Sequence, residues 1–341
     1  MIEVTRFTGA PAEWDAFARQ QAGFTHFHLH GWKRVMEQTL GHETHYLGAR
    51  GESGALDGIL PLVRVRSLVF GHYLVSMPFL NYGGPLGGDQ AITALVAGAV
   101  KLAERDGVKL LELRSRRALS IPLRASHRKV TVVLRLPDTT EELMGRFPAK
   151  LRSQVRRPAK DGITYRFGAD QVGPFFEVFS RHMHELGTPT QGRALFEAIS
   201  GGFGESAWFG CAYLGDRAIA AGAGFEWSDE VEMTWASSLA EFNRTSANMG
   251  LYGAFMERAI QRGLSVFNFG RCTPGTGTHR FKLQWGGSEE PLWWYQRAAR
   301  GEGAATPSPE HGAWSWGPRI WRKLPVPLAT ALGPRVVRFI P

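Results

Sequence analysis

A short segment of the sequence places polar and cationic side chains where an apolar run gives way to a loop. Residues 264–269 are mostly apolar and end at Gly270, which predicts a short buried strand. The following residues contain glycine and proline and predict an irregular loop. A cationic and aromatic stretch that contains Lys282 follows, from His279 to Gly286. Ligand sites in α/β folds commonly lie where a central strand ends. Asn268 and Lys282 are therefore candidate catalytic residues, with Arg271 beside them.

The same spacing also has a purely structural interpretation. Phe281 and Trp285 are four residues apart, so on a helix they would share one face and pack inward. Spacing alone favours this interpretation, and other stretches are needed to decide between the two.

Several stretches together resemble a known family. They are Phe267-Asn268-Phe269-Gly270-Arg271, Phe281-Lys282-x-x-Trp285-Gly286, Trp32 to His42, Val75-Ser76-Met77-Pro78-Phe79, Asn81-Tyr82-Gly83-Gly84, Leu111-Glu112-Leu113-Arg114 and the basic stretch Arg152 to Lys160. This pattern is similar to the Fem-type aminoacyltransferases of the GNAT acyltransferase superfamily. It is most similar to the FemAB-related proteins associated with exosortase and exopolysaccharide loci. The likeness extends over most of the chain, and it is more specific for the family than for the reaction.

The resemblance implies an acyltransferase that forms an amide bond on an amine of a cell-envelope precursor of peptidoglycan or exopolysaccharide. The acceptor would be linked to a nucleotide or a lipid. The donor would be aminoacyl-tRNA or acyl-CoA, with no tightly bound cofactor and no metal. Two alternatives stay open: an acyl-CoA-dependent N-acyltransferase acting on a polysaccharide sugar or a small amine, and a non-catalytic partner of a polysaccharide-assembly complex.

The resemblance also indicates where donor and acceptor would bind. GNAT proteins that use acyl-CoA hold its pyrophosphate at a Q/R-x-x-G-x-G/A turn that opens a helix. Arg244 matches the leading cation of this turn, but Ala247 and Met249 alter its small positions, which weakens the acyl-CoA alternative. Lys282 matches a Fem-type lysine placed near the reacting ester. The full set of predicted donor- and substrate-binding residues is Arg244, Arg271, Phe281, Trp285, Lys33, Arg34, Arg152, Arg156 and Tyr82.

The basic stretch has two interpretations of equal weight. Residues 146–166 contain seven cations and one acid, Asp161. On a helix Arg152 and Arg156 share a face and could hold phosphates. A solvated helix face explains the same pattern. Lys33 and Arg34 lie near the position where Fem-like enzymes hold a substrate diphosphate.

Composition limits the class of protein. The chain has 341 residues, 43% hydrophobic and 21% charged, which is typical of a globular protein. The formal charge of +9 favours an anionic partner, namely nucleic acid such as tRNA, a phosphorylated carrier or a membrane surface. Two distant cysteines and the lack of a signal or spanning segment predict a cytoplasmic protein. The alternating histidines at positions 26, 28 and 30 have no further ligands in the pattern, so we expect no metal site.

The order of expected elements occurs twice. A hairpin, a strand, a helix closed by glycine and a further strand are expected in residues 1–145 and again in 146–298, which indicates a duplicated domain. We therefore predict an α/β (α+β) fold with two tandem GNAT-like domains, each a mixed, mostly antiparallel sheet flanked by helices. Residues 299–341 are expected to form a linker and a basic tail outside both domains, in peripheral contact with the inner membrane. Its tryptophans are Trp314, Trp316 and Trp321.

Overall fold

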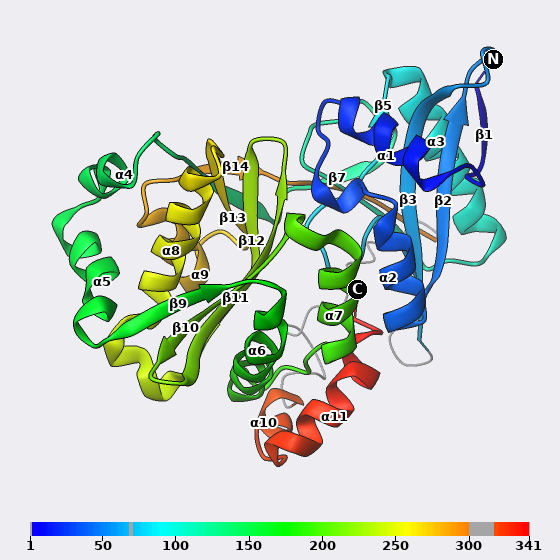
Figure 1. The fold of residues 1–341 in the computed structure, drawn as a ribbon. Helices are drawn as coiled ribbons and strands as arrows, with labels where there is room; N and C mark the ends of the chain where they lie inside the picture. Colours follow the sequence, from blue (N-terminus) through cyan, green and yellow to red (C-terminus); the bar gives the residue numbers. More distant parts are fainter. Residues whose placement is uncertain (1, 68–70, 300–316, 341) are drawn as a thin grey trace. The chain divides into compact units, whose positions relative to one another are not determined.

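The computed structural model describes residues 2–67, 71–299 and 317–340 (Figure 1). Its contacts divide the chain into two units. Unit 1 comprises Met1–Lys129, Pro291–Trp314 and Arg335–Pro341, and unit 2 comprises Val130–Glu290 and Ser315–Pro334, in each case without the undescribed residues. No described helix combines the length and the apolar character that crossing a bilayer requires.

Unit 1 is built on a mixed sheet with strand order β1-β2-β3-β4-β6-β15-β7, and β5 pairs with β3. Strands β4 and β6 are parallel, whereas β1, β2 and β3 form an antiparallel meander. The elements are β1 Glu3–Arg6, α1 Pro11–Gln20, η1 His26–His28, α2 Gly31–Leu40, β2 Glu43–Arg50, β3 Leu56–Ser67, β4 Gly71–Val75, β5 Leu86–Gly87, α3 Asp89–Arg105, β6 Leu110–Ser115, β7 Arg124–Ser126 and β15 Trp293–Ala298.

Unit 2 is built on a second mixed sheet, with strand order β14-β8-β13-β12-β11-β10-β9. Strands β12 and β13 are parallel, whereas β9 to β12 form an antiparallel series and β8 pairs antiparallel with β13. The elements are β8 Val130–Arg135, α4 Thr140–Arg146, α5 Ala149–Lys160, β9 Ile163–Phe167, η2 Ala169–Gln171, α6 Val172–Leu186, α7 Arg193–Phe203, η3 Gly204–Ser206, β10 Ala207–Leu214, β11 Arg217–Trp227, β12 Glu230–Ser238, η4 Ala240–Thr245, α8 Ala247–Gln261, β13 Val266–Cys272, α9 Gly277–Leu283, β14 Ser288–Pro291, α10 Gly317–Trp321 and α11 Val326–Val337.

The predicted fold class is confirmed, because each unit has a mixed sheet with helices and the same element order. The unit boundaries differ from the predicted 1–145 and 146–298. Strand β8 pairs with β13 in the sheet of unit 2, and β15 pairs with β6 and β7 in the sheet of unit 1. The pattern of apolar and polar residues in β8 and β15 is compatible with either sheet. The sequence pattern therefore did not reveal to which sheet each strand belongs.

The predicted basic helix is two helices. α4 ends at Arg146 and α5 begins at Ala149, with Phe147 and Pro148 extended between them at ψ angles of 141° and 151°. A proline restricts the residue before it to extended backbone, so the helix ends ahead of Pro148. Pro148 is the N-cap residue of α5, where its missing N–H breaks no helical hydrogen bond.

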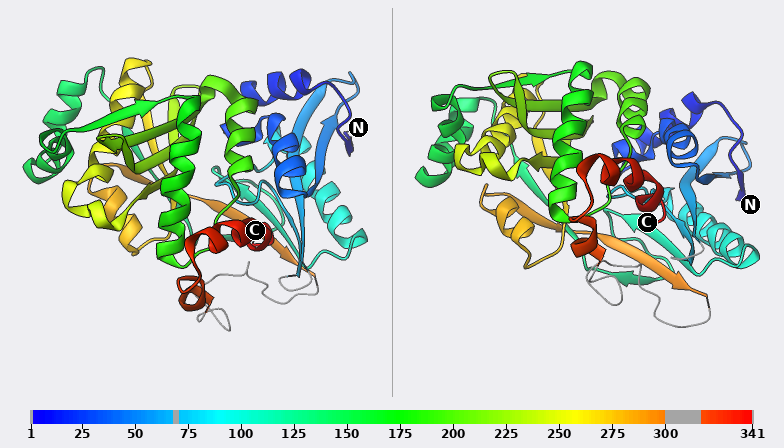
Figure 2. Two further views of the ribbon diagram at one scale, coloured as in Figure 1. Left: turned by 60° about the horizontal axis from the view of Figure 1, so that its bottom comes forward. Right: turned by 90° about the horizontal axis from the view of Figure 1, so that it is seen from below.

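The C-terminal segment packs on the protein and does not form an appendage (Figure 2). In unit 2, His184 Nε2 lies 2.8 Å from the Leu324 carbonyl oxygen. In unit 1, His42 Nε2 lies 2.7 Å from the Arg338 carbonyl oxygen. Trp314 and Trp316, predicted as membrane anchors, lie outside the described residues, whereas Trp321 ends α10 and is half-buried.

Candidate functional site

The parallel strands of unit 2 separate after a short paired stretch. β12 pairs with β13 at three positions, the last joining Glu232 to Asn268. β12 continues to Ser238 and remains paired with β11 on its other side. On the side that faces β13, residues 233–238 therefore have no strand partner among the described residues. An unpaired strand edge offers N–H and C=O groups to an extended ligand.

The equivalent parallel pair of unit 1 is closed by its own chain. Beyond the last pair, Val75 with Glu112, the Ser76 amide donates to the Glu112 carbonyl at 2.9 Å. The Gly83 amide donates to the Arg114 carbonyl at 3.0 Å, so the loop after β4 occupies the edge of β6. The open edge that a carrier could use therefore belongs to unit 2.

Asn268 holds a bulge in β13. The register of β13 against β8 shifts between Asn268 and Arg271, where Gly270 has a φ of +71°. The Asn268 Oδ1 accepts from the Thr131 hydroxyl at 2.6 Å and from the Gly270 amide at 2.8 Å, and its Nδ2 donates to Glu230 Oε1 at 2.7 Å. Asn268 is fully buried, so it stabilises the bulge from inside the sheet and does not line an open cleft. We call this the strut role of Asn268.

Lys282 reaches the same bulge from α9. Thr276 caps this helix, its side chain accepting from the His279 amide. The Lys282 Nζ donates to the Gly270 carbonyl at 2.7 Å and to the Arg271 carbonyl at 3.0 Å. Only 5% of Lys282 is exposed.

The environment of Lys282 shifts its protonation toward neutral pH. The pKa of Lys282 is lowered to about 8, chiefly because burial desolvates the ammonium group and to a smaller extent through the nearby charge of Arg271. Cys272 and Glu232 act in the opposite direction on this pKa. A buried lysine with a lowered pKa at a strand end is a recurring property of functional sites.

A small cavity lies at the amino end of α8, where β12 ends. Its volume is about 220 Å³. The polar residues that line it are Gln154, Ser238, Asn243, Ser246 and Asn248. Ser246 precedes the helix in a left-handed conformation, with φ +58°. The amino end of a helix carries partial positive charge and suits an anion.

Residues 233–238 of β12 connect the two features. The strand begins beside the Asn268 and Lys282 bulge and ends at the cavity that Ser238 lines. Six extended residues span about 20 Å. A ligand along this edge would thus reach both ends.

The aromatic candidates pack in the core of unit 2. Trp285 is 1% exposed, with ring centroids 5.5 Å from Phe147 and 5.7 Å from Tyr252. Phe281 is half-buried, and its ring centroid lies 5.1 Å from that of Tyr252. The structure therefore supports the structural interpretation of these two residues.

The predicted cations of unit 2 do not converge on one point. Arg244 is exposed on η4, next in sequence to the residues that line the cavity. Arg271 is half-buried at the bulge. On α5, Arg152 Nη1 donates to the Phe147 carbonyl, whereas Arg156 is exposed. Arg152 and Arg156 both line an open groove of about 650 Å³.

The candidates of unit 1 lie on or beside its first helices. Lys33 Nζ pairs with Glu37 Oε1 at 2.7 Å, and Arg34 is exposed on the same helix, α2. Tyr82 is 1% exposed, with its ring centroid 5.7 Å from that of Phe27, so it belongs to the core.

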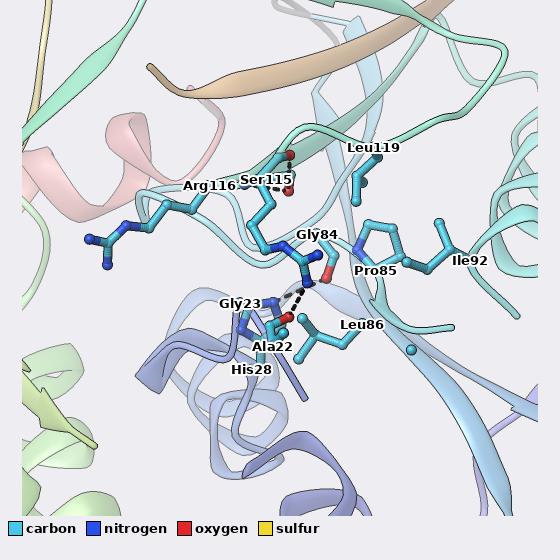
Figure 3. A pocket seen from close by; sticks show the side chains of 12 residues that line it. Ala22, Gly23, His28, Gly84, Pro85, Leu86, Ile92, Ser115, Arg116 and Leu119 are labelled. Carbon is cyan, nitrogen blue, oxygen red and sulfur yellow. Dashed lines mark hydrogen bonds between the residues drawn. The ribbon is translucent and has the colours of Figure 1, made fainter. Parts of the chain in front are cut away.

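Unit 1 contains a smaller cavity, which its own side chains fill almost completely (Figure 3). Its volume is about 10 Å³, which is room for one water molecule. The His28 Nε2 lies 3.1 Å from the Gly84 carbonyl oxygen, and Arg117 Nη1 donates to the Ala22 carbonyl at 2.6 Å. Within the described ranges no three His, Cys, Asp or Glu residues are grouped as a metal site.

Sequence reasoning missed the polar lining of the α8 cavity. Asn243, Ser246 and Asn248 carry no motif, and Gln154 comes from a distant helix. The altered turn from Arg244 to Met249 was the available signal, because it placed an anion-binding helix start at this position.

The bulge gives a first prediction. Asn268→Leu should destabilise the protein by about 2–4 kcal/mol, because it removes three buried hydrogen bonds, to the Thr131 hydroxyl, the Gly270 amide and Glu230. Urea unfolding measures this, with Thr131→Val as a control that removes one of the three bonds and should cost less. Equal stability of Asn268→Leu and the parent protein would contradict the strut role.

Comparisons with known proteins identify a domain family and several similar folds. Residues 145–283 match the acetyltransferase (GNAT) domain family. The fold is similar to the crystal structure of FemX, at TM-score 0.66 and 14% identity, covering 86% of this chain and 97% of that chain. It is also similar to the C-terminal domain of a putative lysylphosphatidylglycerol synthetase from Agrobacterium fabrum, at TM-score 0.56 and 15% identity, covering 84% and 91%.

A third similar structure is a tandem GNAT protein from the clavulanic acid biosynthesis pathway. It has a TM-score of 0.56 and 12% identity, and the match covers 89% of this chain and 100% of that chain. No curated protein sequence matches the chain.

Proposed function

We propose that this chain, which contains a GNAT-type acetyltransferase domain within a tandem GNAT fold, is a Fem-like acyltransferase that forms an amide bond. The observation that carries the proposal is the open edge of β12 in unit 2. It begins beside Lys282, whose pKa is lowered to about 8, and ends at the cavity of α8. This arrangement suits an acyl group on an elongated carrier arm, with the reacting carbonyl at the bulge and an anionic group at the helix start.

The reaction is transfer of the acyl group from the carrier to an amine. The neutral amine attacks the carbonyl carbon, a C–N bond forms, and the bond from that carbon to the sulfur or oxygen of the carrier breaks. The proton lost by the amine neutralises the departing thiolate or alkoxide. Positioning and electrostatic stabilisation supply most of the rate in such a reaction.

Lys282 has the positive charge that electrostatic stabilisation requires. At neutral pH its ammonium group is mainly protonated, since its pKa is about 8. Two of its protons are directed at the Gly270 and Arg271 carbonyls, which fix the group in place. We propose that its positive charge stabilises the negative charge that develops on the acyl oxygen.

The α8 cavity favours acyl-CoA as the donor. Its volume of about 220 Å³ and its polar lining suit a phosphate-bearing end of a carrier, and the matched family is an acetyltransferase family. Two details of the turn oppose acyl-CoA. The first is that Met249 stands where the acyl-CoA turn has a small residue. The Ala247 amide also donates to the Thr245 hydroxyl at 3.2 Å, which leaves the helix start less open to a pyrophosphate.

A second candidate donor is aminoacyl-tRNA, which the exposed face of α5 favours. Arg152, Arg156 and Lys160 repeat every four residues, so their side chains follow one face at about 6 Å per step. A row of cations at such intervals suits the phosphates of a nucleic-acid strand. Both donors are cytoplasmic, so we propose that the reaction takes place there.

For the acceptor we propose an amine of a nucleotide- or lipid-linked cell-envelope precursor, of peptidoglycan or exopolysaccharide type. The support is the Fem-type motif around Lys282 together with the shared fold of FemX and the lysylphosphatidylglycerol synthetase domain.

One experiment separates the donors. Purified protein is incubated with an amine acceptor and either acyl-CoA or charged tRNA, and the amide product is detected by mass spectrometry. Asn248→Trp, which fills the α8 cavity, should raise the KM for acyl-CoA about tenfold or more, since the indole would occupy the space proposed for the phosphate and tenfold corresponds to about 1.4 kcal/mol. Gln261→Trp at the other end of α8 is the matched control and should leave this KM unchanged.

The outcomes are distinct. Turnover with acyl-CoA that depends on Asn248 supports the first donor. Turnover with charged tRNA that falls in an Arg156→Gln/Lys160→Gln variant supports the second. No amide product with either donor and a panel of amino sugars and amino lipids would contradict the proposed activity.

A further inference from the structure

The exposed large hydrophobic residues of the described chain lie in one part of unit 2. They are Leu186, Ile320, Val326 and Leu328, which are 52%, 51%, 36% and 46% exposed. Leu186 ends α6, and the other three belong to α10 and α11. We call these four residues the tail patch. Exposed apolar residues scattered singly need no explanation, but a grouped set marks an interaction surface.

The patch is held in place by close packing. Gly187 follows Leu186 with φ +75°, and a Cβ there would lie 2.4 Å from the Pro318 carbonyl oxygen. The α10 segment thus approaches the end of α6 as closely as glycine allows, which sets Leu186 next to α10 (Figure 2). His184 also contacts the Leu324 carbonyl.

The inner face of α11 is packed in the same way. Ala329 is 2% exposed, and a Cβ at Gly333 would lie 2.7 Å from the Thr190 carbonyl oxygen. The exposure of Leu328, on another face of this helix, is therefore a property of a docked helix. It does not come from a frayed end.

Three exposed cations lie in the same segment as Ile320. Arg319, Arg322 and Lys323 are exposed on α10 and the turn after it. The sequence of residues 317–340 contains five arginines and lysines and neither Asp nor Glu. Apolar side chains bordered by arginine and lysine are characteristic of segments that lie in a membrane interface.

We propose that the tail patch binds the surface of an anionic lipid bilayer, with its apolar side chains among the acyl chains and its cations at the lipid phosphates. α11 has twelve residues, which is too short to span a membrane, so it would lie along the surface. A second copy of the chain fits less well, because a two-fold interface would bring the three cations of each copy together. The inference does not depend on the identity of the donor or acceptor.

Co-sedimentation with vesicles tests the proposal. The full-length protein is mixed with vesicles of phosphatidylcholine alone or with 30% phosphatidylglycerol, at low and high salt. We expect binding to the anionic vesicles that weakens as salt is raised. Arg319→Gln/Arg322→Gln/Lys323→Gln should lower the partition coefficient about 100-fold. Ile320→Ser/Leu328→Ser should lower it at both salt concentrations, since its contribution is apolar.

The matched control neutralises three exposed cations elsewhere in unit 2. Arg156→Gln/Arg157→Gln/Lys160→Gln changes the net charge equally but leaves the tail patch intact, so it should retain most of the vesicle binding. Circular dichroism confirms that each variant folds. Equal losses in the two triple variants would show attraction through net charge alone and overturn the proposal. So would a parent protein that does not pellet, or a dimer that the Ile320→Ser/Leu328→Ser variant dissociates without any vesicle binding by the parent.

Discussion

Replacing Lys282 by methionine should reduce the rate of amide formation about 10²–10³-fold, which is the usual effect of removing one group that stabilises a developing oxyanion. Methionine has nearly the same length and shape, so the packing of α9 against the bulge should survive. The free energy of unfolding at pH 7 should change by less than about 2 kcal/mol, because the variant loses two hydrogen bonds but also the cost of burying a charge. Single-turnover kinetics and urea unfolding measure the two effects.

The pH dependence of stability provides an independent measurement. The pKa of Lys282 is about 8 in the folded protein and 10.5 for an ordinary lysine, so burial has lowered it. Between these two pH values the unfolded chain holds a proton that the folded protein has released. Stability therefore rises with pH over this interval, by up to about 3 kcal/mol for this group. Lys282→Met should lack this rise, as a difference between the two unfolding curves.

The pH dependence of the rate distinguishes the roles of the lysine. If its charge is required, the rate of the parent protein should fall above pH 8 as the ammonium group loses its proton. A rise of the rate through pH 8 that Lys282→Met abolishes would instead mean that the neutral amine of Lys282 acts as a base, whereas a rise that the variant keeps would come from the acceptor amine. Arg280→Met is the matched control, since Arg280 is an exposed cation on the same helix and its Nη1 donates to the Gly275 carbonyl at 2.9 Å, away from the bulge carbonyls of Gly270 and Arg271. It should leave both profiles unchanged.

The fold class was predictable from the sequence because local patterns decide it. The hairpin expected within residues 1–145 appears as β2 and β3, and the helix closed by glycine appears as α3 Asp89–Arg105, which Gly107 follows. Periodicity and glycine positions specify such elements without reference to the rest of the chain.

The sheet to which a strand belongs was not predictable in this way. β8 follows the elements of unit 1 along the chain yet pairs with β13, and β15 follows those of unit 2 yet pairs with β6. The residue pattern of a strand predicts which of its side chains are buried. It does not predict the partner strand, since backbone hydrogen bonds are the same in every pair.

The candidate site was predictable in part. The segment around Asn268 and Lys282 was identified, and the structure brings both to one bulge through the Gly270 backbone. The polar lining of the α8 cavity was not, because Gln154 and Ser238 come from elements far apart in the sequence. For the aromatic candidates, the sequence could not distinguish a role in binding from a role in packing, since an aromatic ring is suited both to a core and to a ligand.

Trp285→Ala tests that last distinction and should cause the largest loss of stability, about 3–5 kcal/mol. The indole is 1% exposed, and its ring centroid lies 5.5 Å from that of Phe147, 5.7 Å from Tyr252 and 6.0 Å from Phe269. Removing it opens a large cavity among four elements of unit 2. For a unit of this size the melting temperature should fall by about 10 °C or more.

Trp285→Phe separates packing from binding. The indole Nε1 has no hydrogen-bond partner among the described residues, so phenylalanine loses volume but no bond. We expect a smaller loss of stability and a donor KM equal to that of the parent protein, because the ring faces the core. A Trp285→Ala protein with unchanged melting temperature and a raised donor KM would instead place the indole against the carrier. The bulge, α9 and the aromatic cluster would then form one surface that contacts the carrier.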